Sequence, residues 1–237
     1  MNDRTPSQSG RRRGSRHGRS RRSQGSGREP KGVSREERKL KTRQDLLQAA
    51  LRLLENRSFD SLSLREVTRE AGVVPTAFYR HFEDMDQLAL ALVEDSFVAL
   101  RQMLREVRSG PLPATNMIHS SIEVLVNHVR ENRLHFRFIV RERYAGVSAL
   151  RHAIRSELRL LTSELATDLA RLPYLRDWPT DDLQMMAGLM VNAVVSTAEA
   201  IVDSSGGPER EEEVIRTTEH QLRLIALGVP HWKTSSA

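Results

Sequence analysis

The sequence predicts an all-α protein of about nine helices, with a three-helix N-terminal head and a larger helical body. Three observations indicate this fold class. Apolar residues recur at three- and four-residue spacing through most of the chain after residue 34. Serine, aspartate or proline stands where these periodic segments begin, and glycine or proline where many of them end. No segment shows the sustained alternation of apolar and polar residues that is typical of a strand.

The first two helices are marked by local signals. Leu47 and Leu51 share one face of a segment that lies between residues 34 and 56, which predicts an amphipathic helix. Ser63 and Glu66 form a capping box at the start of the second helix. Gly72 follows that helix, and glycine is the residue preferred just beyond a helix C-terminus.

The remaining helices follow the same rules. Pro75 suits the first turn of a third helix, which we predict to run to Phe82. Asp84 and Gln87 form another capping box, for a long fourth helix that ends at Gly110. Five more helices are predicted at 118–130, 134–144, 148–172, 180–203 and 209–227.

Composition limits the class of protein. The chain has 237 residues, of which 38% are hydrophobic, enough for one sizeable core or two small ones. It has no cysteine, which excludes a disulfide framework, a thiolate zinc site and a cysteine nucleophile. No apolar run reaches the roughly 20 residues of a spanning helix, and no apolar segment follows the basic N-terminus. We therefore expect no membrane span, no secretory signal and a cytoplasmic location.

Positive charge is concentrated at the N-terminal end. Residues 1–43 hold 15 Lys and Arg against 4 Asp and Glu, whereas the rest of the chain holds 22 and 27. This asymmetry favours a polyanionic partner near the N-terminus. Residues 1–33 are rich in Arg, Ser and Gly with almost no apolar side chain, so we expect a disordered arm. The arm either follows a phosphate backbone or only makes the chain more soluble.

The predicted third helix has two unlike faces. At about 100° per residue, Phe78 and Phe82 share a face with Pro75, which anchors the helix to its domain. Thr76, Ala77 and Arg80 point the opposite way, with Tyr79 and His81 on the flanks. A small polar outer face edged by hydrogen-bond donors indicates a helix that is presented to a partner.

The second and third helices, joined by a short turn, predict a helix-turn-helix that places its second helix in the DNA major groove. Small side chains at Thr76 and Ala77 permit close approach to base edges, and Arg80 can reach guanine or phosphate. We expect the other contacts to be donation by Tyr79 and His81 to the backbone, a base-edge contact by Arg65, and a phosphate at the amides behind Ser63. Two alternatives stay open, a core role for the aromatic helix and pairing of Arg65 with Glu66 or Glu70.

The stretch LSLREVTREAGVVPTAFYRHFEDMDQL resembles the DNA-binding signature of the TetR family of bacterial transcription regulators. The shared features are a Gly-Val turn, an aromatic residue, a Tyr-x-His-Phe run and a helix that begins a few residues later. The resemblance covers residues 41–97. It implies DNA contacts at Arg65, Pro75, Thr76, Ala77, Tyr79 and His81.

One position departs from the family pattern. Many members carry a phosphate-binding lysine shortly after the tyrosine, where this chain has Glu83 and Met85. We expect the arm, or Lys39, Lys41 and Arg43, to replace that contact.

The resemblance also implies that the later helices form a ligand-binding and dimerisation domain. The segment at 180–203 supports a dimer independently, because it is apolar nearly all round and needs cover on both sides. A homodimer sets two recognition helices roughly 34 Å apart and so predicts a near-palindromic operator in double-stranded DNA. The predicted organisation is an arm at 1–33, a DNA-binding domain at 34–97 with its helix-turn-helix at 63–82, a ligand-binding and dimerisation domain at 98–230, and a flexible tail at 231–237.

The body is similar to TetR-type repressors of unsaturated fatty acid biosynthesis, which sense long-chain acyl thioesters. The similar stretches include FRFIVRERYAG, LRHAIRSELRLLTSELATDLA and STAEAIVD. The resemblance implies an acyl-CoA or acyl-carrier-protein effector, with no other cofactor. We expect an apolar tunnel and a basic mouth, with candidate residues Met103, Leu104, Ile122, Leu125, Met186 and Met190 for the tunnel and Arg137 and Arg141 for the mouth. Core packing by these methionines, and ion pairs of these arginines with Glu142 or another helix, are the alternatives.

Other classes of protein fit less well. The eight histidines lack metal-ligand spacing, and no phosphate loop or nucleophile motif is present, so we expect no catalytic or metal site. A nucleoid protein without a sensor, or an RNA-binding protein, remains an alternative because of the arginine-rich arm. Within the regulator class, the alternative effector is an unrelated drug-like or aromatic molecule.

Overall fold

The computed structural model describes residues 34–109, 117–203 and 207–232, apart from the side chains of residues 99, 103–109 and 117. Within these ranges the chain forms nine α-helices and two short 3-10 helices, with no strand. The prediction of an all-α fold is confirmed. The arm at 1–33 lies outside the described residues, as do residues 233–237 of the tail.

The helices lie close to their predicted positions. They are α1 (Arg35–Leu53), α2 (Leu64–Glu70), α3 (Pro75–Phe78), α4 (Met85–Ser109), α5 (Met117–Glu131), α6 (Arg133–Glu142), α7 (Ser148–Leu169), α8 (Thr180–Asp203) and α9 (Gly207–Gly228). The 3-10 helices are η1 (Phe59–Ser61) and η2 (Val229–His231).

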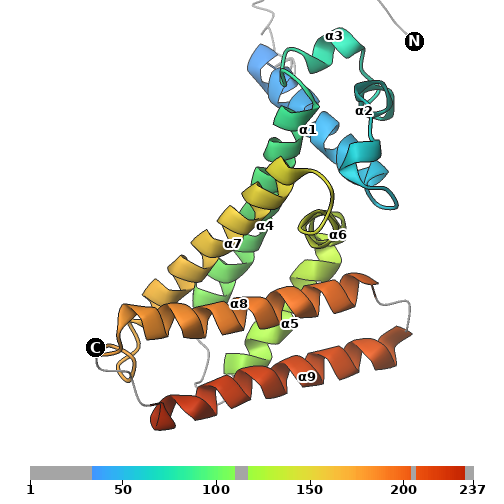
Figure 1. Cartoon of the computed structure of the whole chain (residues 1–237). Helices are drawn as coiled ribbons and strands as arrows, with labels where there is room; N and C mark the ends of the chain where they lie inside the picture. The colour runs from blue at the N-terminus through green and yellow to red at the C-terminus, as the bar shows by residue number, and fades with distance from the viewer. Residues whose placement is uncertain (1–33, 110–116, 204–206, 233–237) are drawn as a thin grey trace, which may run out of the picture.

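The head and body share one long helix (Figure 1). Helices α1 to α3 gather at one end of the molecule, and α4 leaves them and runs into the body beside α7. Helix α6 contacts α1, α4 and α8, so it lies between head and body. Helices α8 and α9 run antiparallel and pack together at the end remote from α3. Because α4 is continuous across residues 97 and 98, the head cannot tilt on the body without moving this helix.

One hydrophobic core passes through both parts. Leu47, Phe78 and Phe82 in the head belong to the same buried cluster as Ile139 and Ile154 in the body. A smaller cluster gathers around Leu175 and Met186, where α7, α8 and the segment between them meet. A shared core links head and body mechanically, since close-packed interiors transmit displacements.

Helix α3 is shorter than the sequence predicts. It ends at Phe78, and the chain continues to Phe82 in tight turns. The amide of Arg80 donates to Ala77 O at 3.2 Å and that of His81 to Phe78 O at 2.8 Å, so these bonds span three residues. Such bonds tighten the last turn of a helix. The prediction of a regular α-helix to Phe82 was therefore wrong in its second half.

The start of α4 differs in one detail. Asp84 Oδ1 accepts from the amide of Gln87 at 2.8 Å, as a capping box requires. Gln87 Oε1 accepts a hydrogen bond from the amide of Glu83 at 2.8 Å, whereas a capping box would have it accept from the amide of Asp84. The amide of Glu83 thus takes part in the cap at the start of α4.

Helix α8 has one buried and one open side. Eight of its residues are buried, among them Leu183, Ala187 and Ile201. Met185 and Leu189 lie on the open side, with 43% and 52% of their surfaces exposed. By length and composition this helix is also the one in the described part of the chain that is apolar enough to cross a membrane, a test that core helices of soluble proteins pass as well.

Candidate nucleic-acid interface

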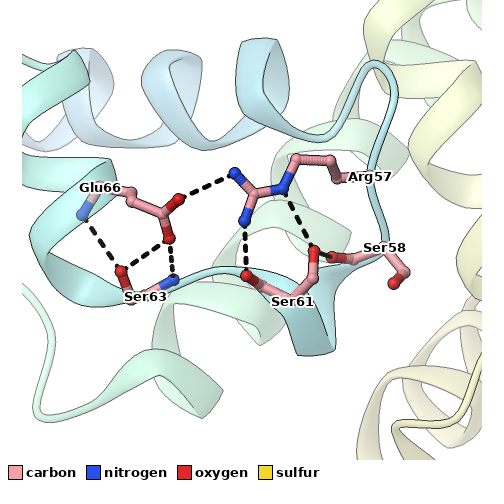
Figure 2. A network of polar contacts seen from close by, with 5 residues as sticks. All are labelled: Arg57, Ser58, Ser61, Ser63 and Glu66. Atoms are coloured by element: carbon pink, nitrogen blue, oxygen red, sulfur yellow. Dashed lines mark hydrogen bonds and ion pairs between the residues drawn. The ribbon is translucent and has the colours of Figure 1, made fainter.

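Helix α2 begins in a network of polar contacts (Figure 2). The Ser63 side chain accepts from the amide of Glu66 at 3.4 Å, and Glu66 Oε2 accepts from the amide of Ser63 at 3.0 Å. Arg57, in the connector after α1, donates from Nη1 to Glu66 Oε1 at 2.9 Å. The same guanidinium donates to the carbonyl of Ser61 at 2.6 Å. Arg57 thus joins the α1–α2 connector to the first turn of α2.

These contacts change the acidity of Glu66. The hydrogen bond from Arg57, and then those with Ser63, lower the pKa of Glu66 from 4.5 to about 2. The carboxylate therefore stays ionised at any physiological pH. A negative charge in the first turn of a helix also interacts favourably with the helix dipole.

The turn after α2 fixes the direction of α3. The amide of Val73 donates to Thr68 O at 2.9 Å and that of Gly72 to Arg69 O at 3.1 Å, which is the Schellman arrangement. Gly72 has φ +68°, a left-handed conformation that residues with a Cβ adopt at a cost. Pro75 then occupies the first turn of α3.

Two buried phenylalanines hold α3 against the head. Phe78 and Phe82 are almost fully buried, with ring centroids 5.4 Å apart. The guanidinium of Arg43 on α1 lies over the Phe82 ring, 5.2 Å from its centroid. The prediction that these phenylalanines anchor the segment is confirmed. Arg43 packs against this anchor.

The opposite face of this segment is open. Thr76 and Arg80 are exposed, and 62% of the Tyr79 surface is exposed. Pro75 is exposed as well, so the prediction that it shares the anchored face with Phe78 and Phe82 was wrong. Arg65 is also exposed on α2. Its two suggested acidic partners are engaged elsewhere, because Glu66 binds Arg57 and Glu70 binds Arg52 at 2.8 Å. The exposed side chains of this segment and of Arg65 are therefore available to a partner.

A groove of about 850 Å³ runs between α1 and the segment that starts with α3. Its lining consists of Arg35, Glu36, Arg38, Lys39, Thr42, Ala77, Arg80 and His81. Four of these side chains are Lys or Arg and one is Glu. A positively charged groove beside an exposed helix suits a phosphate backbone.

His81 lies among these cations. Burial, followed by the charges of Lys39, Arg43 and Arg80, lowers the pKa of His81 below its ordinary value of 6.5. The imidazole is therefore neutral at neutral pH in the free protein. A neutral imidazole can donate one hydrogen bond, and an adjacent phosphate favours its charged form.

The structure adds residues that sequence reasoning missed. Arg35, Arg38 and Thr42 line the groove from successive turns of α1, whereas Lys41 is exposed but is not part of the lining. The missed signal was helical spacing, since positions 35, 38, 39 and 42 fall on one face. Of the three α1 cations that the sequence suggests for a phosphate, Lys39 lines the groove, whereas Lys41 and Arg43 do not.

The two arginines suggested for a ligand mouth lie at the joint between head and body. Arg141 Nη1 on α6 donates to Leu54 O at 3.3 Å and to Arg57 O at 3.1 Å. Arg137 Nη1 lies 3.6 Å from Glu55 Oε1. Both guanidinium groups therefore contact the connector after α1, in line with the alternative that they bond to another part of the chain.

A buried carboxylate strengthens this joint. Glu142 is 1% exposed, and its Oε1 accepts from the amide of Phe59 at 3.0 Å. Glu142 Oε2 is buried and has no hydrogen-bond partner in the described part of the chain. Burial raises the pKa of Glu142 above its ordinary value. Helix α6 thus holds the first part of the connector that leads to α2, from Leu54 to Phe59.

The residues suggested for an apolar tunnel are divided between the two clusters. Ile122 and Leu125 are buried in the main core, and Met186 is buried in the smaller cluster. Met190 packs against both clusters. Met103 and Leu104 belong to α4, but their side chains lie outside the described residues.

The helix-turn-helix head, its exposed α3 face and the helical body define a DNA-binding transcription regulator of two domains. The family description "Bacterial regulatory proteins, tetR family" matches residues 46–92, and "Tetracyclin repressor-like, C-terminal domain" matches residues 114–228. These matches together cover more than half of the chain. The chain belongs to the TetR family.

Solved structures share the fold at low sequence identity. A putative TetR-family transcriptional regulator from Syntrophomonas wolfei is 13% identical, with a TM-score of 0.66 over 80% of this chain and 96% of that one. A TetR-like transcriptional regulator from Rhodococcus sp. RHA1 is 18% identical, with a TM-score of 0.61 over 79% and 96%. FadR from Bacillus subtilis, solved with stearoyl-CoA, is 13% identical, with a TM-score of 0.62 over 78% and 98%.

Proposed function

We propose that the protein is a cytoplasmic, dimeric, sequence-specific DNA-binding repressor whose operator affinity is changed by a small hydrophobic effector. The observation that carries the proposal is the pairing of an open α3 face with the basic groove beside it. Base edges require small or donor side chains, and phosphates require cations, so the two surfaces have complementary tasks.

The DNA contacts divide by chemistry. Thr76, Ala77, Arg65 and Arg80 read base edges, with Pro75 beside them. The amides behind Ser63 bind a phosphate at the N-terminus of α2. The other phosphate contacts come from Tyr79, His81, Lys41 and the cations of the groove, with Arg43 supporting the Phe82 anchor.

Dimerisation uses the open faces of α8 and α9. Leu189 on α8 and Leu224 on α9 are 52% and 73% exposed, an unfavourable state for large apolar side chains in water. The two helices are tied together by a hydrogen bond of 2.6 Å between the buried hydroxyls of Thr197 and Thr218. A two-fold axis through this pair places two heads on successive turns of a near-palindromic operator.

The effector is a long-chain acyl-CoA or acyl-carrier protein. Support comes from the body motifs and from the stearoyl-CoA complex of the Bacillus subtilis FadR, which has the same fold. Met190, which contacts both apolar clusters, is placed where an acyl chain can separate them. Such a chain displaces α6 and, through Arg141 and Glu142, the connector to α2. An effector needs only a few kcal/mol of differential affinity to change the spacing of the heads.

The test uses the full chain in mobility-shift assays on its own upstream DNA, with and without stearoyl-CoA. We expect specific binding, about tenfold weaker binding for Arg65→Ala or Arg80→Ala, and unchanged binding for the exposed body variant Arg176→Ala. A complex that changes with stearoyl-CoA supports the effector. A specific complex that ignores it contradicts the effector class and leaves the DNA-binding proposal standing.

A further inference from the structure

A second groove in the body is lined by arginines. It lies where the end of α6 meets α7 and α8, and its volume is about 380 Å³. Among its ten lining residues, all within the described part of the chain, three are arginines and none is acidic. Arg143 comes from the end of α6, and Arg155 and Arg159 come from α7.

These guanidinium groups are only weakly neutralised. Arg143 Nη2 lies 3.9 Å from Glu199 Oε2, and the guanidinium stacks over the Tyr144 ring at 4.4 Å. Arg159 donates to the Ser156 hydroxyl at 2.9 Å, which carries no charge. Arg155 makes no hydrogen bond or ion pair with the described residues. Three cations with one distant carboxylate leave a positive field in the groove.

Part of the groove lining is apolar. Leu158, Val191 and Val195 form part of the lining. Gly188 on α8 contributes no side chain there, and a Cβ at this position would meet only Thr162 Cγ2, at 3.9 Å. A groove of this volume that combines apolar side chains with a few charged ones is typical of a small-molecule site.

We propose that this groove binds the phosphate-bearing part of an amphipathic ligand, with its phosphates on Arg143, Arg155 and Arg159 and an apolar part on Val191 and Leu158. Guanidinium groups bind phosphate oxygens bidentately, and the stacked Arg143 is already held in place. Binding replaces the distant Glu199 with a closer anion. The inference builds on the proposed function, because it assigns the charged head of the effector to a site apart from Arg137 and Arg141.

The position of the groove gives the ligand a route to the head. Arg143 directly follows Arg141 and Glu142, which hold the connector that leads to α2. An anion that pulls Arg143 toward α7 therefore acts on the same end of α6. This geometry couples occupancy of the groove to the orientation of the helix-turn-helix.

Calorimetric titration of the full chain with stearoyl-CoA, coenzyme A and stearate tests the assignment. We expect stearoyl-CoA to bind most tightly, coenzyme A to bind more weakly, and both affinities to fall as salt is raised. Arg155→Gln with Arg159→Gln is expected to weaken both by roughly tenfold for each arginine, with the affinity for stearate unchanged. Gly188→Leu fills the groove and is expected to abolish coenzyme A binding, whereas Gly188→Ala, which fits, is the matched control.

Operator binding without ligand is measured for every variant, so that the regulator proposal is judged separately. Unchanged affinities for coenzyme A and stearoyl-CoA in both the double variant and Gly188→Leu would overturn the groove. If the wild type binds neither stearoyl-CoA nor coenzyme A, the groove proposal is overturned as well, together with the acyl-CoA effector. Specific operator binding in the same preparations would show that the DNA-binding function stands even then.

Discussion

Arg57 Nη1 lies 2.9 Å from Glu66 Oε1, so an arginine outside α2 completes the cap of this helix (Figure 2). The carbonyl of the same Arg57 accepts from Arg141 on α6. One residue therefore touches both the first turn of α2 and the body helix that lies against the head. Arg57 is therefore a polar connection between α6 and the start of α2.

Replacing Arg57 by Met removes its side-chain contacts but keeps the backbone carbonyl that accepts from Arg141. The aliphatic part of the side chain is retained, but the bonds to Glu66 and to the Ser61 carbonyl are lost. We expect operator affinity to fall about tenfold through misplacement of α2, while the response to effector is reduced. Fluorescence anisotropy on labelled operator, with and without stearoyl-CoA, measures both. Arg52→Met, which removes the ion pair with Glu70 at the other end of α2, is the control.

Acid is expected to weaken the head through Glu66. Its pKa is about 2 in the folded protein and near 4.5 otherwise, so the stabilisation it gives is present above pH 4.5 and is lost as pH falls toward 2. Glu66→Gln should remove this part of the pH dependence. Thermal unfolding followed by circular dichroism at pH 3 and pH 6 provides the comparison. Equal pH dependence in the two proteins would contradict the network in Figure 2.

Ser63→Ala removes the other half of the cap. We expect the protein to lose about 1 kcal/mol of stability, the usual effect of deleting a serine N-cap. DNA affinity should also fall, because the amides at the start of α2 are no longer ordered for a phosphate. Asp84→Ala removes the equivalent cap of α4 and serves as the comparison for stability alone. Equal losses of DNA affinity in both variants would argue against a phosphate at α2.

Most substitutions of buried residues destabilise a protein, but we do not expect Glu142→Gln to do so at high pH. Burial raises the pKa of this carboxyl, so its ionised form destabilises the fold as pH rises through the folded pKa. Gln keeps an acceptor for the amide of Phe59 and carries no charge. We expect the variant to be at least as stable as the wild type at pH 8, with its advantage lost near pH 4. Chemical unfolding at the two pH values measures this difference, and a large loss at pH 8 would contradict it.

We expect the His81 imidazole to take up a proton when the protein binds its operator. The free imidazole has a lowered pKa, and a neighbouring phosphate raises it, so binding should tighten as pH falls from 8 to 6. His81→Gln should bind with little pH dependence over the same range. Anisotropy titrations at constant salt test this, with His152→Gln, on the exposed side of α7, as the control. Identical pH profiles for wild type and His81→Gln would remove His81 from the interface.

Much of the head could be predicted because its signals are local. Ser63 with Glu66, Gly72 and Pro75 each specify a backbone conformation through neighbours within a few residues, and the structure has the expected cap and turn. The end of α3 could not be fixed in this way. After Phe78 the chain turns so that Phe82 packs beneath Arg43, a residue 39 positions earlier, and local signals do not specify such a distant contact.

The joint and the body groove lay beyond sequence reasoning for a different reason. Arg141 and Arg143 are two residues apart, yet one bonds to the α1–α2 connector and the other lines a groove with α7 and α8. Helical spacing indicates that such residues face different ways, but it does not say which element each one meets. Only the packing of α6 between head and body assigns these partners.

Selection of binding sites from a random duplex library by the full chain tests the central claim most directly. A dimer that presents two α3 faces is predicted to enrich a near-palindromic sequence whose half-sites lie about one helical turn apart. Thr76→Glu, which places a negative charge on the exposed face of α3, is predicted to abolish the enrichment. Retention of DNA without any enriched sequence, or the same enrichment by Thr76→Glu, would contradict the account.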